Sequence, residues 1–151
     1  MSVLKNKRSE SSLQFIETAK EIFIETVQFV SRLSKRYDKI LASGVTNTAY
    51  GILNNVIIGN KMFPNGEYFK ARRREHFIKA EGFLDSLDIQ LFIVYQILIK
   101  NPQGCFVVHD KPISSGEAIK KLENMSKKLG TLIEKEKALL IKLKKSDEKR
   151  K

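Results

Sequence analysis

The sequence has very little of the residues that build covalent staples and metal sites. Among its 151 residues there are one cysteine and two histidines. The single cysteine, Cys105, excludes an internal disulfide framework and leaves no partner for a cysteine-based metal site, so it indicates a reducing compartment. We expect its thiol to be buried and inert.

Signatures of catalysis and of cofactor binding are also missing. No glycine pair has the spacing of a phosphate-binding or dinucleotide-binding loop, and there is no nucleophile elbow. A di-iron helix bundle requires Glu-x-x-His pairs, whereas His76 directly follows Glu75 and His109 lies in a predicted linker. The sequence therefore predicts a protein that is not an enzyme and holds no metal or cofactor.

Long hydrophobic runs are absent as well. The most apolar stretch, Ile89 to Ile99, contains Gln90 and Gln96 and falls short of the roughly 20 residues that cross a bilayer. The basic residues near the start of the chain are not followed by an apolar stretch of the kind found in secretory signals. We expect a cytoplasmic protein with no membrane segment.

What the sequence has in excess is positive charge. Its 28 Lys and Arg residues against 17 Asp and Glu give a formal net charge of +11. Such an excess favours a polyanionic partner, RNA or DNA, or an anionic surface. The alternative interpretation is that the lysines only coat exposed helix faces and keep the protein soluble.

Helical periodicity organises most of the chain. Seven apolar residues alternate at spacings of three and four in its central segment: Phe77, Ala80, Leu84, Leu87, Leu91, Val94 and Leu98. This heptad seam predicts a helix over about 67–100. Similar stripes predict helices over about 12–36, 38–58 and 115–145. Ser114 and Glu117 form a capping box for the last helix, and a short extended piece is expected at 105–108.

Four long amphipathic helices without an alternating strand pattern predict an all-α fold, an antiparallel four-helix bundle. We expect a flexible basic arm at 1–10, the bundle at 11–145 and a fraying basic tail at 146–151. Because residues 89–99 are apolar nearly all round, they are expected to pack on helices of their own chain and on another subunit.

The strongest candidate site is basic. The predicted nucleic-acid-binding residues gather at the start of the central helix: Lys70, Arg72, Arg73, Arg74 and Lys79. The guanidinium group of arginine can donate two hydrogen bonds to one phosphate, and the neighbouring Tyr68 and Phe69 can stack on unpaired bases. The alternative is a solvated helix face.

A second alternative is a helical ribonuclease of the HEPN type, whose motif separates an arginine and a histidine by at least four residues. Arg72 and His76 share a helix face but have only three residues between them. The spacing therefore departs from that motif.

Three segments carry a family resemblance: NNVIIGN at 54–60, KAEGFLDSLDIQL at 79–91 and LGTLI at 129–133. Together they resemble the bacterial four-helix bundle family that includes the 23S rRNA intervening-sequence proteins and the accessory variability determinants of diversity-generating retroelements. The resemblance covers roughly residues 12 to 143. The segment VTNTA at 45–49 stands where the intervening-sequence branch usually carries basic residues, which favours the retroelement branch.

The resemblance implies a function. Accessory proteins of that branch are ring-shaped homopentamers with a basic surface that bind nucleic acid and associate with a reverse transcriptase. It implies that this chain is a homo-oligomer with RNA or DNA and a reverse transcriptase as partners. The alternative that the resemblance leaves open is a structural or protein-interaction bundle of the intervening-sequence type.

Overall fold

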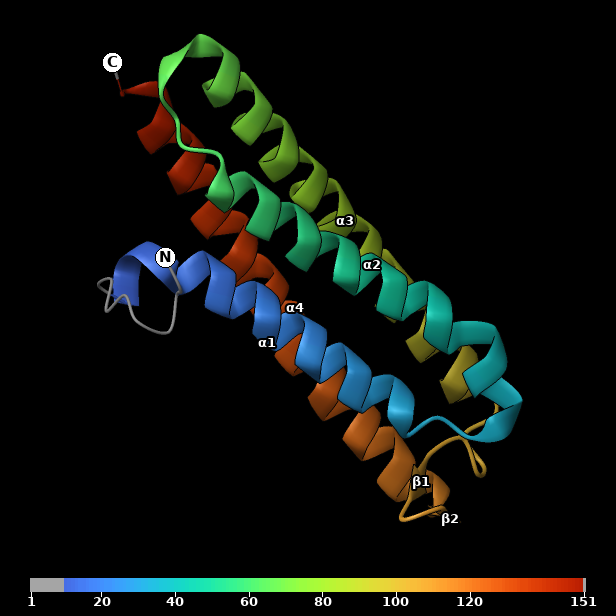
Figure 1. Cartoon of the computed structure of the whole chain (residues 1–151). Helices are drawn as coiled ribbons and strands as arrows, with labels where there is room; N and C mark the ends of the chain where they lie inside the picture. Colours follow the sequence, from blue (N-terminus) through green and yellow to red (C-terminus); the bar gives the residue numbers. More distant parts are fainter. Residues whose placement is uncertain (1–9, 151) are drawn as a thin grey trace.

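The computed structural model describes residues 10–150 and is built almost entirely from helices (Figure 1). The helices are α1 Glu10–Ser31, α2 Lys35–Lys61, α3 Gly66–Lys100 and α4 Ser115–Glu148. A two-stranded hairpin, β1 Val107–Val108 with β2 Lys111–Pro112, lies between α3 and α4. The predicted all-α class and the four predicted helices are confirmed.

Each helix contacts two others. α1 packs on α2 and α4, and α3 packs on the same two helices, whereas the described residues of α1 and α3 make no close backbone contact with each other. The connections between successive helices lie at alternate ends of the molecule (Figure 1). One hydrophobic core therefore runs along the axis between the four helices.

The heptad seam of α3 faces that core. All seven of its apolar residues, from Phe77 to Leu98, are buried. In α1 the fully buried apolar residues include Ala19, Ile22 and Phe29, whereas Val27 is exposed. α1 packs against two helices, so its buried face is wider than a single stripe.

α2 continues beyond its predicted end at 58, through Gly59 to Lys61. Gly59 lets the ring of Phe77 approach the backbone of α2. A Cβ atom at position 59 would lie 2.6 Å from Cε1 of Phe77. Glycine at this position is therefore required by close packing between α2 and α3.

The linker after α3 is more ordered than a simple loop. His109 and Asp110 both adopt left-handed backbone angles and form the turn between β1 and β2. Phe106 bridges to Leu33, and the backbone N–H of Ser34 donates to the carbonyl of Cys105 at 2.8 Å. The expected extended piece is confirmed at Val107–Val108, and the linker closes this end of the core.

Cys105 and Ser114 agree with their predictions. The Cys105 side chain is buried, and burial raises the pKa of its thiol. A raised pKa keeps the thiol protonated and unreactive. The side chain of Ser114 accepts a hydrogen bond from the backbone N–H of Glu117 at 3.3 Å, as expected for the N-cap of α4.

The predicted boundary of the basic tail is wrong. α4 continues to Glu148 and does not fray after residue 145, and Asp147 is buried. The helix persists because Asp147 is held by an arginine of α3. The predicted arm at 1–10 lies outside the described residues, except for Glu10, which begins α1.

Glu136 is a carboxyl group in the middle of the core, and no sequence pattern distinguished it from its apolar neighbours. It lies on the buried face of α4 with Leu129, Ile133 and Leu140, and its exposed fraction is 0%. Neither carboxylate oxygen has a hydrogen-bond partner among the described residues. Burial raises the pKa of Glu136 to about 8, so the group is protonated at neutral pH.

The pKa of Glu136 predicts a pH dependence of stability. Between its ordinary value of 4.5 and about 8, the folded state binds more protons than the unfolded state. The contribution of Glu136 to the free energy of unfolding therefore falls as pH rises through this window, by about 1.4 kcal/mol per unit of pKa difference. Glu136→Gln should remove that slope, as measured by urea unfolding from pH 5 to pH 8.5.

The matched control is Glu134→Gln, which removes an exposed carboxylate one half-turn away. Its stability curve should run parallel to that of the parent. Parallel curves for the parent and Glu136→Gln would contradict the assignment of a raised pKa to this carboxyl group.

Candidate nucleic-acid interface

Arg73 lies inside the protein, where its side chain joins three helices. Its Nε donates to Oδ2 of Asp147 in α4 at 2.6 Å, and its guanidinium donates to the carbonyls of Gly59 and Met62 at 3.1 and 3.2 Å. The guanidinium carbon also lies 4.9 Å from the centre of the Phe77 ring. The side chains of Arg73 and Asp147 are only 8% and 12% exposed.

The sequence around Arg73 explains this arrangement. The last carbonyls of α2 have no partners within their own helix, and an arginine supplies donors for them. Position 73 also falls one turn before Phe77 on the buried face of α3. Arg73 was predicted to contact phosphates, but its donors face Asp147 and the end of α2, so we remove it from the proposed surface.

Lys70 and Arg74 lie on the side of α3 that faces α4. The ammonium group of Lys70 donates to the backbone carbonyl of Arg150, and Arg74 pairs with Glu148 at 2.5 Å. Farther along the same seam, Lys144 pairs with Glu81 at 2.7 Å. These cations connect α3 to α4, and their charge is partly neutralised by the carboxylates.

Arg72 and Lys79 point to solvent. They share one carboxylate, Glu75, at 3.4 and 3.8 Å, and both side chains are about half exposed. Two cations around one exposed carboxylate leave an excess of positive charge. The five predicted site residues are therefore not one cluster. Arg72 and Lys79 can meet a ligand without breaking a contact to α4 or to the residues after it, whereas the other three cannot.

His76 is half-buried between α3 and α2. Its Nδ1 lies 2.9 Å from Oδ1 of Asn55, whose amide nitrogen donates to the carbonyl of Gly51 at 2.9 Å. Because that oxygen can only accept, Nδ1 of His76 carries the proton. Burial and then the positive charges of Lys79 and Arg72 lower the pKa of His76, so the ring is neutral at pH 7.

Additional cations come from the end of α4 and of α2. Within residues 10–150, these exposed side chains have no carboxylate within salt-bridge distance: Lys61, Lys142, Lys145, Lys149 and Arg150. In the sequence they lie far from Arg72, but the turn between α2 and α3 brings them to the same end (Figure 1). The basic composition of residues 142–151 was the only sequence signal for them.

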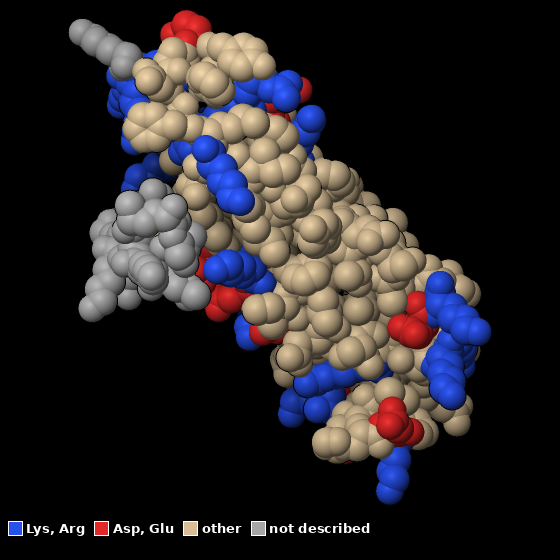
Figure 2. Space-filling model, viewed as in Figure 1, with Lys and Arg blue, Asp and Glu red and all other residues tan. Residues whose placement is uncertain are grey.

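This part of the molecule is named the basic end, meaning residues 56–81 and 139–150. It holds eleven Lys and Arg residues against five Asp and Glu. Figure 2 shows Lys and Arg side chains gathered where α4 finishes and again at the opposite end, with uncharged residues between them. On the face of the molecule shown there, positive charge is therefore concentrated toward the two ends.

Long uncharged stretches occur in α2 and in the last third of α3. No charged residue occurs in α2 between Lys39 and Lys61, or in α3 between Asp88 and Lys100. Several large apolar side chains of α3 are exposed here: Ile89 at 59%, Phe92 at 60%, Ile93 at 46% and Ile99 at 40%. One side of residues 89–99 is therefore buried in its own chain, and the other side is exposed.

α3 is also long and apolar enough to cross a membrane by length and composition, and 28% of its most apolar window is buried. Core helices of water-soluble proteins can meet the same criterion, so the finding does not place the helix in a bilayer.

Within residues 10–150, no three His, Cys, Asp or Glu side chains come together as a metal site would require. The chain matches no protein-family model, and no curated protein or solved structure is similar to it. Support for a function therefore comes from the geometry and charge of its own residues.

The burial of the Arg73–Asp147 pair predicts a large effect of removing one partner. Arg73→Gln leaves Asp147 as an unpaired buried carboxylate and should lower the free energy of unfolding by about 3–5 kcal/mol. Urea denaturation followed by circular dichroism measures this loss. The control Arg74→Gln removes an exposed ion pair and should cost less than about 1 kcal/mol. Equal losses in the two variants would contradict a structural role for Arg73.

Proposed function

We propose that this chain is a non-enzymatic protein that binds RNA or DNA and acts as a homo-oligomer. We also propose that the four helices form an antiparallel four-helix bundle. It is supported by the contacts of each helix with two neighbours and by connections at alternate ends of the molecule. In this arrangement the start of α3 and the finish of α4 lie at the same end.

The observation that carries the proposal is the excess of exposed cations over carboxylates at the basic end. Among residues 10–150, five of these cations, from the end of α2 and from the end of α4 and the residues after it, have no carboxylate within salt-bridge distance, and Arg72 and Lys79 of α3 share a single one. Arg73 and Lys144, by contrast, are paired with carboxylates and contribute to the fold. Unpaired lysines and arginines around one end favour a ligand with several negative charges, such as a phosphate backbone.

The contacts of His76 favour binding over ribonuclease activity. Arg72 pairs with Glu75, while His76 donates to Asn55 and is neutral at pH 7. A neutral histidine engaged by an amide and surrounded by cations is not a ready proton donor.

The family resemblance extends the proposal to a partner protein. We propose that the chain is an accessory protein of a diversity-generating retroelement, in the cytoplasm, with a reverse transcriptase as its partner. The rival is a structural bundle of the ribosomal intervening-sequence type, in which the basic end only confers solubility. The two differ in one measurable property, which is affinity for nucleic acid.

Charge reversal at the basic end tests that affinity. The double variant Arg72→Glu, Lys79→Glu should weaken binding to both RNA and DNA. It makes fewer phosphate contacts than the parent, so its binding releases fewer counterions. The slope of log affinity against log salt should fall by about 0.7–0.9 for each contact removed. Fluorescence anisotropy with labelled strands over a salt series measures both quantities.

A control at the opposite end separates a local effect from net charge. Lys35→Glu, Lys39→Glu makes the same change in charge at exposed positions in the first turns of α2. This control should bind more tightly than the variant at the basic end. If the parent binds no nucleic acid, the rival interpretation stands. If the parent binds but the two variants bind alike, the basic end is a solvated surface and the nucleic acid binds elsewhere.

The uncharged surface of α3 supports self-association. Four exposed apolar side chains occupy a stretch of eleven residues between Asp88 and Lys100. Eleven helical residues span about 16 Å, roughly half of the hydrocarbon core of a bilayer, so a second copy of the chain fits this surface better than a membrane does. A second copy presents the same apolar residues and needs no charged partner.

Disruption of this surface should change the mass of the particle. We expect the parent to be a multimer of the 17.3 kDa chain, with five subunits as the family resemblance implies. Phe92→Glu, Ile93→Glu should yield smaller particles, because burying carboxylates in an apolar interface is unfavourable. Light scattering after size-exclusion chromatography measures the mass.

Ile141→Glu is the matched control, since Ile141 is 46% exposed and belongs to α4. Its mass should equal that of the parent, and moderate salt should not dissociate either particle. A parent that remains monomeric at micromolar concentration would contradict self-association. Partition of the parent into lipid vesicles would show that a membrane covers the surface.

A further inference from the structure

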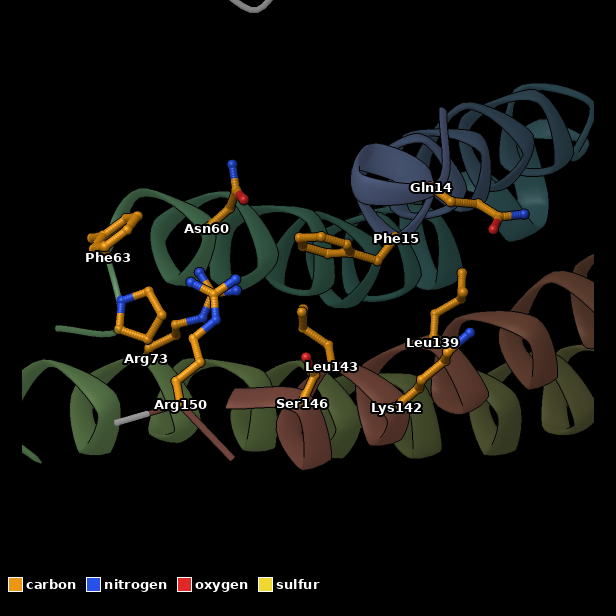
Figure 3. Close-up of a pocket in the computed structure, with 11 residues that line it drawn as sticks. Gln14, Phe15, Asn60, Phe63, Arg73, Leu139, Lys142, Leu143, Ser146 and Arg150 are labelled. Atoms are coloured by element: carbon orange, nitrogen blue, oxygen red, sulfur yellow. The ribbon is translucent and has the colours of Figure 1, made fainter. Parts of the chain in front are cut away.

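A cleft of about 490 Å³ opens at the basic end, between the start of α1, the turn after α2 and the last turns of α4. Figure 3 shows the side chains that surround it. Phe15, Phe63, Leu139 and Leu143 give it an apolar wall. Its volume lies within the usual range for small-molecule sites.

Phe63 has an unusual position for a large aromatic residue. It lies in the turn between α2 and α3 and is 70% exposed, whereas the neighbouring Pro64 is buried. Phe15, on the other side of the cleft, is buried and packs edge to face on Phe77 at 5.9 Å between ring centres. One wall is therefore fixed in the core, and the other offers a largely free aromatic face.

Positive charge lies beside this aromatic face. The guanidinium carbon of Arg150 lies 6.0 Å from the centre of the Phe63 ring, and Lys142 also lines the cleft. Neither cation has a carboxylate within salt-bridge distance in the described part of the chain. Arg73 reaches the same space but is engaged by Asp147.

The polar groups at the cleft complete its chemistry. Gln14 and Asn60 supply side-chain amides, and Ser146 supplies a hydroxyl group. Amides can both donate and accept, so they can match the edge of a nucleobase. An apolar wall with an exposed ring, free cations and amides is the combination that holds a base and its phosphate together.

We propose that this cleft binds one unpaired nucleotide of a single-stranded nucleic acid. The base stacks on Phe63 and the adjoining phosphate contacts Arg150. A neighbouring phosphate of the strand contacts Lys142 at the other side of the cleft (Figure 3). A paired base cannot enter, because both of its faces are stacked within a duplex. The inference rests on the proposed nucleic-acid function and adds to it a preference for single strands.

The experiment compares a single strand of roughly six nucleotides that carries 2-aminopurine with the same strand in a duplex. Phe63→Ala should weaken single-strand binding about tenfold or more and leave duplex binding unchanged, because stacking is lost. For Phe63→Ala, the slope of log affinity against log salt should equal that of the parent. Arg150→Gln should instead lower the slope by about 0.7, since it removes a phosphate contact.

Two variants serve as controls. Phe63→Tyr retains the ring and should bind as the parent does. Tyr68→Ala removes an aromatic side chain that is also 70% exposed but does not line the cleft, and it should have a smaller effect than Phe63→Ala. Phe63 and Tyr68 are both exposed, so all of these variants are expected to fold.

The possible outcomes separate this inference from the proposed function. If Phe63→Ala binds the single strand as the parent does, or weakens both strand forms equally, the cleft assignment is overturned while the proposed function stands. If the parent binds neither form, both are overturned. Displacement of the 2-aminopurine strand by dodecanoate at lower concentrations than by adenosine monophosphate would assign the cleft to an acyl chain and overturn the inference.

Discussion

The buried ion pair between Arg73 and Asp147 is the interaction on which the arrangement of the basic end depends. It holds the last turn of α4 against α3, while the same guanidinium closes the end of α2 by donating to two of its carbonyls. Without this pair, α4 would have little reason to remain helical to Glu148. The lysines that follow Leu140 would then have no fixed position relative to Arg72 and Lys79.

Fixing the end of α4 separates the cations into two groups. Those on the seam between α3 and α4 pair with carboxylates and contribute to the fold, as Arg74 and Lys144 do. On the outer faces, Lys142 and Lys145 have no carboxylate partner within residues 10–150, and Arg72 and Lys79 share Glu75 of their own helix. The same helix end also forms one side of the cleft beside Phe63. A single buried contact therefore positions both the charged surface and the cleft.

In the described part of the chain, the contact between α2 and α3 is made by apolar side chains and not by ion pairs. Gly59 and Gly51 allow the rings of Phe77 and Phe83 to lie directly against α2, which keeps α2 and α3 close together. A close pair of helices cannot bury every apolar residue of α3, so Phe92 and Ile93 face outward. Glu136 adds an unpartnered carboxyl group to the core. Both features are unfavourable for an isolated chain, and self-association would relieve the first of them.

The sequence by itself determined the helices and the inward face of α3. Apolar residues in a heptad pattern lie on one side of a helix, and burying that side buries all of them. It also determined the N-cap at Ser114 and the basic character of the protein. Only the tertiary structure decided which cations are free. Arg72, Arg73 and Arg74 are consecutive, but a helix turns by about 100° per residue, so one faces solvent, one the core and one α4. The carboxylates that pair with Arg73 and Arg74 come from α4, more than 70 residues later, and no local sequence pattern indicates those two contacts.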